Sequence, residues 1–195
     1  VIRKISFTGS TPVGKLLAGM AGQHMKRATM ELGGHAPVLI TGDADWEKAA
    51  AQMVVHKTRN AGQVCVSPTR FLVDQKVGDN FLEAFSTGLQ KVKIGNGFDD
   101  GVEMGPLANE RRIPMMEDLI ADAVDQGAKL VTGGKRIGNK GYFVEPTVLA
   151  DVPTSARIMN EEPFGPVAIV NKMSSLDDMI TEANRLDFGL AAYAY

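Results

Sequence analysis

Cysteine is almost absent from this chain of 195 residues, which contains one, Cys65. A single cysteine excludes an internal disulfide framework and a metal site made only of cysteines, so Cys65 is either a small buried residue or a reactive thiol. No apolar run approaches the roughly 18 to 20 residues that cross a bilayer, and no basic and apolar leader opens the chain. These absences predict a cytoplasmic protein without a membrane partner.

Long runs of like charge are also missing. Lysine and arginine total 21 against 23 aspartates and glutamates, and a net charge of -2 provides no basic field to attract nucleic acid. The three histidines, His24, His35 and His56, are too widely separated to suggest a metal pair. We therefore expect no nucleic-acid partner, no metal site, and structural or surface roles for the histidines.

Hydrophobic periodicity predicts alternating strands and helices. Trp46 and Met53 recur at helical spacing and are expected in the core. The order favours an α/β fold with a largely parallel sheet sandwiched by helices. Strands are expected at 2–7, 26–32, 36–41, 69–74, 128–134, 142–151, 166–173 and 190–195, and helices at about 11–23, 45–58, 78–91, 111–126 and 176–186.

Two glycines, Gly33 and Gly34, separate the second and third expected strands and predict a domain boundary. The chain would then consist of domains 1–33 and 34–195. It opens with Val1 instead of methionine and stops in the apolar run GLAAYAY, so we expect a piece of a longer polypeptide.

The stretch KISFTGSTPVGKLL places a glycine turn between a strand and a helix. Gly9 and Gly14 fit a phosphate-loop motif, but Leu16 stands where that motif needs a hydroxyl to bind magnesium. What remains is a helix N-terminus that favours an anion such as a pyrophosphate, with Ser10 as a side-chain donor. The alternative is a structural turn capped by Ser10 or Thr11.

A thiol and a carboxylate lie beside glycines further along. Cys65 follows the glycine-containing loop NAGQV, and Glu31 precedes two glycines that leave its carboxylate room to move. A thiol nucleophile needs a thiolate, donors for the oxyanion that it creates, and a base for water if a covalent intermediate is hydrolysed. By composition alone, neither stretch is specific for this chemistry.

Four segments in order resemble the signature segments of the aldehyde dehydrogenase superfamily: FTGSTPVGK, MELGGHAP, RNAGQVC and NEEPFGPV. The 34-residue step from Glu31 to Cys65 is similar to the family's step from base to nucleophile. The resemblance continues through KIGNGFDD, MGPL, GGK, YFVEPTVL and FGLAAY, so it covers essentially the whole chain. The segments around Glu31 and Cys65 are most like the succinate-semialdehyde and 2-oxoglutarate-semialdehyde dehydrogenase branch.

The resemblance implies a three-layer α/β/α catalytic domain over 34–195, truncated at its C-terminal end. Residues 1–33 would be the last strand, turn and helix of a Rossmann-like NAD(P)-binding domain. It also implies NAD(P)-dependent oxidation of a small aldehyde, without metal, by a homodimeric or homotetrameric whole protein. Cys65 would be the nucleophile and Glu31 the general base. The NAD or NADP cofactor would contact Gly9, Ser10 and Gly14 through its pyrophosphate, Glu162 through the nicotinamide ribose, and Phe164 beside the nicotinamide.

Arg59, six residues before Cys65, suggests the substrate. A guanidinium binds a carboxylate through two hydrogen bonds, which favours a carboxylated semialdehyde such as succinate semialdehyde. The alternative is a structural ion pair at Arg59. Some relatives carry a second cysteine two residues after the nucleophile, but here Ser67 stands there and that disulfide switch is absent. A non-catalytic assembly fragment and a phosphate-loop nucleotide-binding protein remain alternative functions.

Overall fold

The computed structural model describes residues 2–195, which divide into two compact units. One unit ends at Gly34 and the other begins at His35. No helix in residues 2–195 is both long and apolar enough to cross a membrane.

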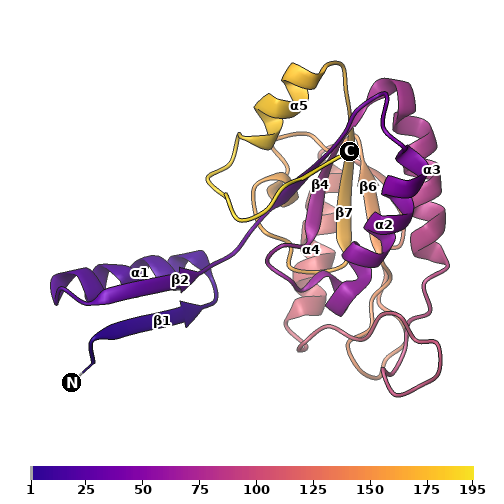
Figure 1. The fold of residues 1–195 in the computed structure, drawn as a ribbon. Coiled ribbons are helices and arrows are strands. Elements are labelled where there is room, and N and C mark those ends of the chain that lie inside the picture. The colour runs from indigo at the N-terminus through magenta and orange to yellow at the C-terminus, as the bar shows by residue number, and fades with distance from the viewer. Residues whose placement is uncertain (1) are drawn as a thin grey trace. The chain divides into compact units, whose positions relative to one another are not determined.

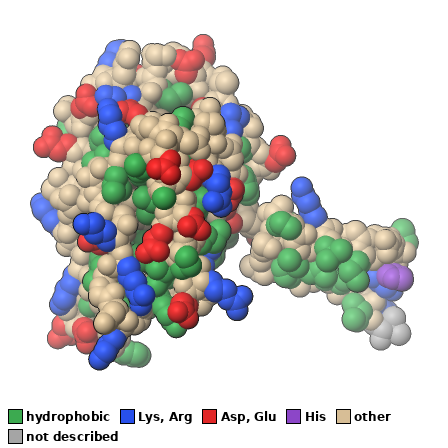
Figure 2. Space-filling model, turned by 180° about the vertical axis from the view of Figure 1, so that it is seen from behind, with side chains coloured by type: hydrophobic (Ala, Val, Ile, Leu, Met, Phe, Trp, Pro, Cys, Tyr) green, Lys and Arg blue, Asp and Glu red, His purple; other side chains and the backbone are tan. Residues whose placement is uncertain are grey.

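The first unit is a strand, a helix and a second strand that pairs in parallel with the first (Figure 1). Its parallel strands align Lys4 with Arg27 and Thr8 with Glu31. The side chain of Val13 on the helix is exposed. Other hydrophobic side chains also lie on the visible face of this unit (Figure 2). The elements are β1 (Lys4–Thr8), α1 (Thr11–Gln23) and β2 (Arg27–Glu31).

The second unit contains a six-stranded sheet in the order β5-β6-β7-β4-β3-β8. All neighbouring strands pair in parallel except β5 and β6, which are antiparallel. The strands are β3 (Ala36–Ile40), β4 (Pro68–Asp74), β5 (Lys129–Thr132), β6 (Thr147–Ala150), β7 (Val167–Met173) and β8 (Tyr193–Ala194). The helices are α2 (Trp46–Thr58), α3 (Gln75–Gln90), α4 (Arg112–Asp125) and α5 (Leu176–Ala183), with short 3-10 turns η1 (Arg59–Gly62) and η2 (Arg157–Met159).

Helices cover both faces of this sheet (Figure 1). Alternate residues of β4 point to opposite faces. Phe71 packs against α2 and α3, and its ring centroid lies 4.8 Å from that of Phe85. Arg70, its neighbour, faces α5 and pairs with Glu182 at 3.2 Å. The expected α/β fold with a largely parallel, helix-covered sheet is confirmed.

Several expected boundaries are displaced. The strand expected over 142–151 is regular only over β6, because Pro146 has no N–H to donate to a ladder. The last strand covers two residues instead of 190–195. Met53 is fully buried as expected, in the hydrophobic cluster that also contains Phe71 and Phe85. Trp46 is only half-buried and packs against the margin of that cluster.

A buried histidine ties β3 to η2. His35 Nε2 donates to the Ile158 carbonyl at 2.8 Å, and its Nδ1 lies 2.7 Å from the Thr69 hydroxyl oxygen. Only 1% of His35 is exposed, and this burial lowers its pKa from 6.5 to about 3. The folded chain therefore holds a neutral imidazole at neutral pH.

Two loops of this unit pack backbone against backbone at a pair of glycines. Gly62 has a φ of +68°, and a Cβ atom added to it would lie 2.2 Å from the Gly165 carbonyl oxygen. A Cβ atom added to Gly165 would in turn lie 2.3 Å from the Met116 sulfur of α4. The approach of the two loops therefore depends on the absence of a side chain at Gly62, and the packing of the second loop against α4 on its absence at Gly165.

Stability should fall as pH decreases from 6.5 towards 3, because the unfolded chain protonates His35 and the folded chain does not. The contribution reaches at most about 1.4 kcal/mol per pH unit. Urea unfolding at pH 7.5, 6 and 5 measures it. The His35→Gln variant should be less stable at pH 7.5 and less sensitive to pH, while His24→Gln, at an exposed site, should match the original chain. Equal pH slopes in all three chains would contradict this assignment.

Replacing Gly62 by alanine should disrupt the contact between the two loops. Gly138 is a matched control, because its φ is +64° and its Cβ would meet nothing within 4 Å. Gly138→Ala should cost only the backbone strain of about 1 to 2 kcal/mol. Gly62→Ala adds a clash with a carbonyl oxygen and should cost at least about 2 kcal/mol more. Urea unfolding compares them, and equal losses would argue against the close approach.

Candidate functional site

The topology of the sheet brings two of the predicted segments together. The segment before β4 carries Cys65, and the segment before β7 carries Glu162 and Phe164. Because β4 and β7 are parallel neighbours, both segments lie at the same edge of the sheet. The contact between Gly62 and Gly165 joins them there.

The loop before Cys65 has a strained backbone. Asn60, Ala61 and Gly62 all have positive φ angles, of 50°, 52° and 68°. A left-handed conformation costs a non-glycine residue about 1 to 2 kcal/mol, so the surroundings must hold it. Such strain gathers at functional sites in proteins, which makes this loop a candidate site on structural grounds.

Gln63 holds the strained loop in place. Its side-chain amide donates to the Asn60 carbonyl and accepts from the Ala108 backbone N–H at 2.8 Å, while Asn60 donates back to the Gln63 carbonyl. Sequence reasoning missed this residue. The only signal was an asparagine, a residue type that tolerates a positive φ; nothing in the sequence pointed to Ala61 or to the distant Ala108.

Cys65 lies in the turn between η1 and β4 and is half-buried. Ser67 closes this turn by donating its backbone N–H to the Val64 carbonyl at 2.9 Å. Among residues 2–195, no group accepts a hydrogen bond from the Cys65 backbone N–H. That N–H is therefore available to an oxyanion formed beside the sulfur.

A buried lysine anchors the far side of the same turn. Lys57 of α2 donates through Nζ to the Pro68 carbonyl at 3.0 Å and to the Ser67 hydroxyl at 3.3 Å. The side chain is fully buried, and this burial lowers its pKa to about 7. Near neutral pH, a large share of the Lys57 amines is therefore uncharged. The hydrogen bond from Lys57 gives the Ser67 hydroxyl a structural role in this turn.

The loop over 161–165 is the second part of the site. Glu161 pairs with Arg157 at 3.0 Å, and the next acid, Glu162, is half-buried. Phe164 is 37% exposed and has a φ of 44°, another left-handed non-glycine residue. Arg112 of α4 donates to the Phe164 carbonyl at 2.8 Å. Arg112 is the second residue that sequence reasoning missed, because no motif includes it.

Arg59 follows the last residue of α2 as its C-cap, and its side chain is exposed. In the part of the chain that the structure describes, its guanidinium forms no ion pair. The alternative of a structural ion pair therefore has no support in residues 2–195. The side chain is free to meet a ligand in solvent.

The remaining predicted residues lie in the first unit. The Gly9 backbone N–H donates to the Glu31 carbonyl at 3.0 Å, which ties the glycine turn to the end of β2. Ser10 occupies the N-cap of α1, but its hydroxyl makes no capping hydrogen bond. Gly14 is buried under Leu32, and Glu31 is exposed. The glycine turn and the predicted base are thus neighbours within this unit.

The histidines do not gather with other metal ligands. His24 and His56 are exposed, whereas His35 is used in the buried network described above. Within residues 2–195, no three side chains from histidine, cysteine, aspartate and glutamate converge into a group that could hold a metal ion.

Comparison with known proteins shows which family the chain resembles. The model of the "Aldehyde dehydrogenase family" matches residues 1–195. The chain is 49% identical over its full length to a putative 4-(hydroxymethyl)benzenesulfonate dehydrogenase from Comamonas testosteroni. It is 43% identical, again over its full length, to the NADP(+) succinate-semialdehyde dehydrogenase of Escherichia coli. It covers 40% of each of these relatives.

A solved structure agrees with these matches. The crystal structure of an E. coli NADP-dependent enzyme superposes with a TM-score of 0.96 at 44% identity, over 99% of this chain and 40% of the other. At this level of identity and overlap, a shared sequence pattern and a shared fold point to one origin. This chain belongs to the aldehyde dehydrogenase family.

Proposed function

We propose that a full-length protein containing this chain oxidises an aldehyde with an anionic tail to the carboxylic acid, using NAD or NADP. The observation that carries the proposal is the strained loop before Cys65, which is locked through Gly62 against the loop of Glu162 and Phe164. Family membership supports this reading over a phosphate-loop nucleotide-binding protein. A non-catalytic assembly role has no comparable feature in its favour.

In the proposed mechanism, the Cys65 thiolate adds to the aldehyde carbonyl carbon and forms a thiohemiacetal. The free backbone N–H of Cys65 stabilises the resulting oxyanion. A bound oxidised nicotinamide would supply the acceptor for the hydride lost from this carbon. Loss of the hydride would leave the substrate joined to Cys65 as a thioester. Glu31 takes a proton from water, and the hydroxide attacks the thioester and releases the acid and the thiolate.

The residues of the first unit fit a dinucleotide. The first turn of α1 contains no acidic side chain, so its free N–H groups and positive dipole end favour a pyrophosphate. The Ser10 hydroxyl, which makes no capping bond, is an additional donor. In the second unit, Glu162 would bind the nicotinamide ribose, and the exposed ring of Phe164 would pack beside the nicotinamide.

The anionic tail is assigned to Arg59. Its exposed guanidinium is without an ion pair among the described residues, and it begins the loop that leads to Cys65. A guanidinium binds carboxylates and sulfonates alike, through paired hydrogen bonds to two oxygens. One relative is named for a carboxylated aldehyde and another for a benzenesulfonate. We propose succinate semialdehyde as the representative substrate.

We propose that the whole protein is longer than residues 1–195. The chain spans about 40% of the length of the relatives that it matches, and the complete active site would include their remaining length. A homodimeric or homotetrameric assembly and a cytoplasmic location stay predictions.

The roles of Cys65 and Glu31 are tested together in a full-length protein that carries this chain. Cys65→Ala should abolish NAD(P)H production from succinate semialdehyde. Glu31→Gln should give one burst of NAD(P)H, equal to the enzyme concentration, followed by turnover slowed about 100-fold or more. Stopped-flow absorbance measures both, and Glu47→Gln, an exposed acid on α2, is the control. Normal turnover by Cys65→Ala would refute the mechanism.

The role of Arg59 is tested by comparing aldehydes that differ in their tails. Arg59→Ala should raise KM for succinate semialdehyde about 10- to 100-fold, the loss of a charged pair of hydrogen bonds, and leave KM for butanal unchanged. Steady-state kinetics with a sulfonated aromatic aldehyde reports whether a sulfonate uses the same site. Lys48→Ala, at the other end of α2, is the control. Equal effects on charged and neutral aldehydes would remove the substrate assignment.

A further inference from the structure

Arg112, the first residue of α4, reaches the loop over 161–165. Its Nη2 donates to the carbonyl oxygens of both Pro163 and Phe164, at 2.5 and 2.8 Å. The guanidinium carbon lies 5.9 Å from the centroid of the Phe164 ring, within range of a cation–π interaction. One side chain therefore contacts the backbone of two consecutive residues and the aromatic ring of one of them.

The loop needs such restraint. Phe164 has a φ of 44°, and a bulky residue keeps this conformation only where its surroundings determine it. Arg112 supplies one restraint, and the contact of Gly165 with Met116 supplies another. Both restraints come from α4, where Arg112 and Met116 are four residues apart and hence lie on one face of the helix. The position of α4 thus sets the position of Phe164.

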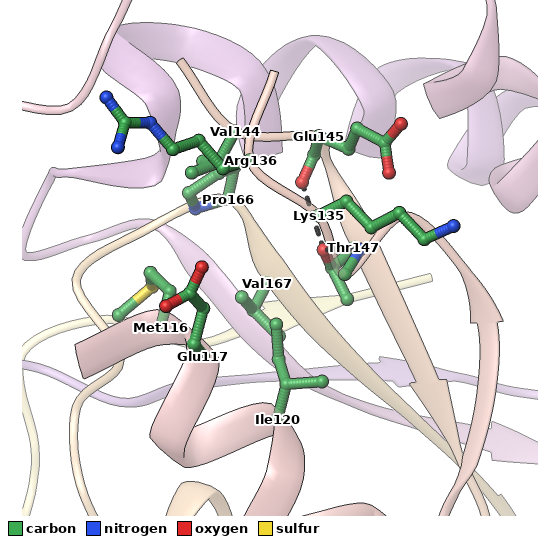
Figure 3. A pocket seen from close by; sticks show the side chains of 11 residues that line it. Met116, Glu117, Ile120, Lys135, Arg136, Val144, Glu145, Thr147, Pro166 and Val167 are labelled. Carbon is green, nitrogen blue, oxygen red and sulfur yellow. Dashed lines mark hydrogen bonds between the residues drawn. The ribbon is translucent and has the colours of Figure 1, made fainter. Parts of the chain in front are cut away.

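The same helix face continues past the loop into the core. Met116 and Ile120 of α4 line a small cavity together with Pro166 and Val167, which follow the loop (Figure 3). The cavity measures about 10 Å³, enough for about one water, so it is not a site for an organic ligand. It lies where the helix and the first residues of β7 pack together.

The charge of Arg112 also reaches Glu162. Burial lowers the pKa of the guanidinium, and the negative charge of Glu162 raises it, so the two groups attract each other. Arg112 Nε is buried and has no hydrogen-bond partner among residues 2–195. Nη1 contacts the Met115 sulfur at 2.7 Å. The side chain is therefore held by the contacts of its two terminal nitrogens, and not by its Nε.

We propose that Arg112 is a positioning residue for the nicotinamide end of the cofactor. By fixing the Pro163 and Phe164 carbonyls, it holds the Phe164 ring and the Glu162 carboxylate in the arrangement that binds nicotinamide riboside. This inference rests on the proposed function for the identity of the ligand. The hold of Arg112 on the loop does not depend on that function.

The hold on the loop is measured by hydrogen exchange in the full-length protein without cofactor. Arg112→Met should speed exchange in the peptide over 161–166 and leave the peptide over 135–141 unchanged. Arg136→Met is the matched control, because Arg136 also donates to two loop carbonyls, those of Asn139 and Gly141. Its effect should be confined to 135–141. Unchanged exchange over 161–166 in Arg112→Met would overturn the inference.

The role toward the cofactor is measured by nucleotide binding. Arg112→Met should weaken NAD(P)H binding, followed by nicotinamide fluorescence, about tenfold or more, the effect of one charged hydrogen bond. It should leave binding of the corresponding adenosine nucleotide, which lacks nicotinamide riboside, unchanged. KM for NAD(P) should rise without a matching rise in KM for the aldehyde. Arg112→Lys, which keeps the charge but not the fork, should fall between the two.

The outcomes separate the two proposals. Equal weakening of NAD(P)H and of the adenosine nucleotide, or an equal effect of Arg136→Met, would show a general structural role and overturn the positioning role. Alkylation of Cys65 by iodoacetamide should proceed at the same rate in Arg112→Met as in the original protein. If neither the original protein nor its Arg112 variants bind NAD(P)H, the proposed function and the cofactor role of Arg112 are both refuted. Hydrogen exchange would still decide whether Arg112 holds the loop over 161–165.

Discussion

The close approach of Gly62 to the Gly165 carbonyl is the contact on which the candidate site of the second unit depends. A single Cβ atom on Gly62 would lie 2.2 Å from that oxygen, so the two loops keep their spacing only while Gly62 has no side chain. The segments of Cys65 and Phe164 extend from this contact. Gly165 is fixed in turn by Met116, which carries the restraint from the site to α4 and the core.

This packing explains how the structure maintains strain beside the reactive thiol. Asn60, Ala61 and Phe164 are left-handed. Asn60 exchanges hydrogen bonds with Gln63 of the same loop, and the Phe164 carbonyl accepts from Arg112 of α4. Gln63 joins the first loop to Ala108, and Arg112 holds the second loop. The parallel pairing of β4 and β7 brings both loops to one edge of the sheet. The sheet therefore sets where the loops begin, and the contacts of Gln63 and Arg112 fix only their local conformation.

Local periodicity was sufficient to predict most elements of the fold. The helix expected over 45–58 was found as α2, since Met53 and its apolar neighbours recur at helical spacing and there is no proline to interrupt them. The contact of Arg112 with Phe164 was not predictable, because it joins residues 52 positions apart. Nor does any pattern signal the left-handed Ala61, whose conformation is imposed by its loop. The catalytic roles of Cys65 and Glu31 came from the family resemblance and stay predictions.

Under the proposed function, each unit ties a cofactor-facing segment to a residue that does chemistry. In the first unit, the Gly9 N–H donates to the Glu31 carbonyl, so the turn that would bind pyrophosphate and the base that would activate water share one hydrogen bond. In the second, Gly165 beside Phe164 contacts Gly62 of the loop that leads to Cys65. In each unit, the segment proposed to face the cofactor is therefore in direct backbone contact with the segment of the base or of the nucleophile. Both contacts are made by backbone groups, so they depend on the course of the chain and not on the identity of an exposed side chain.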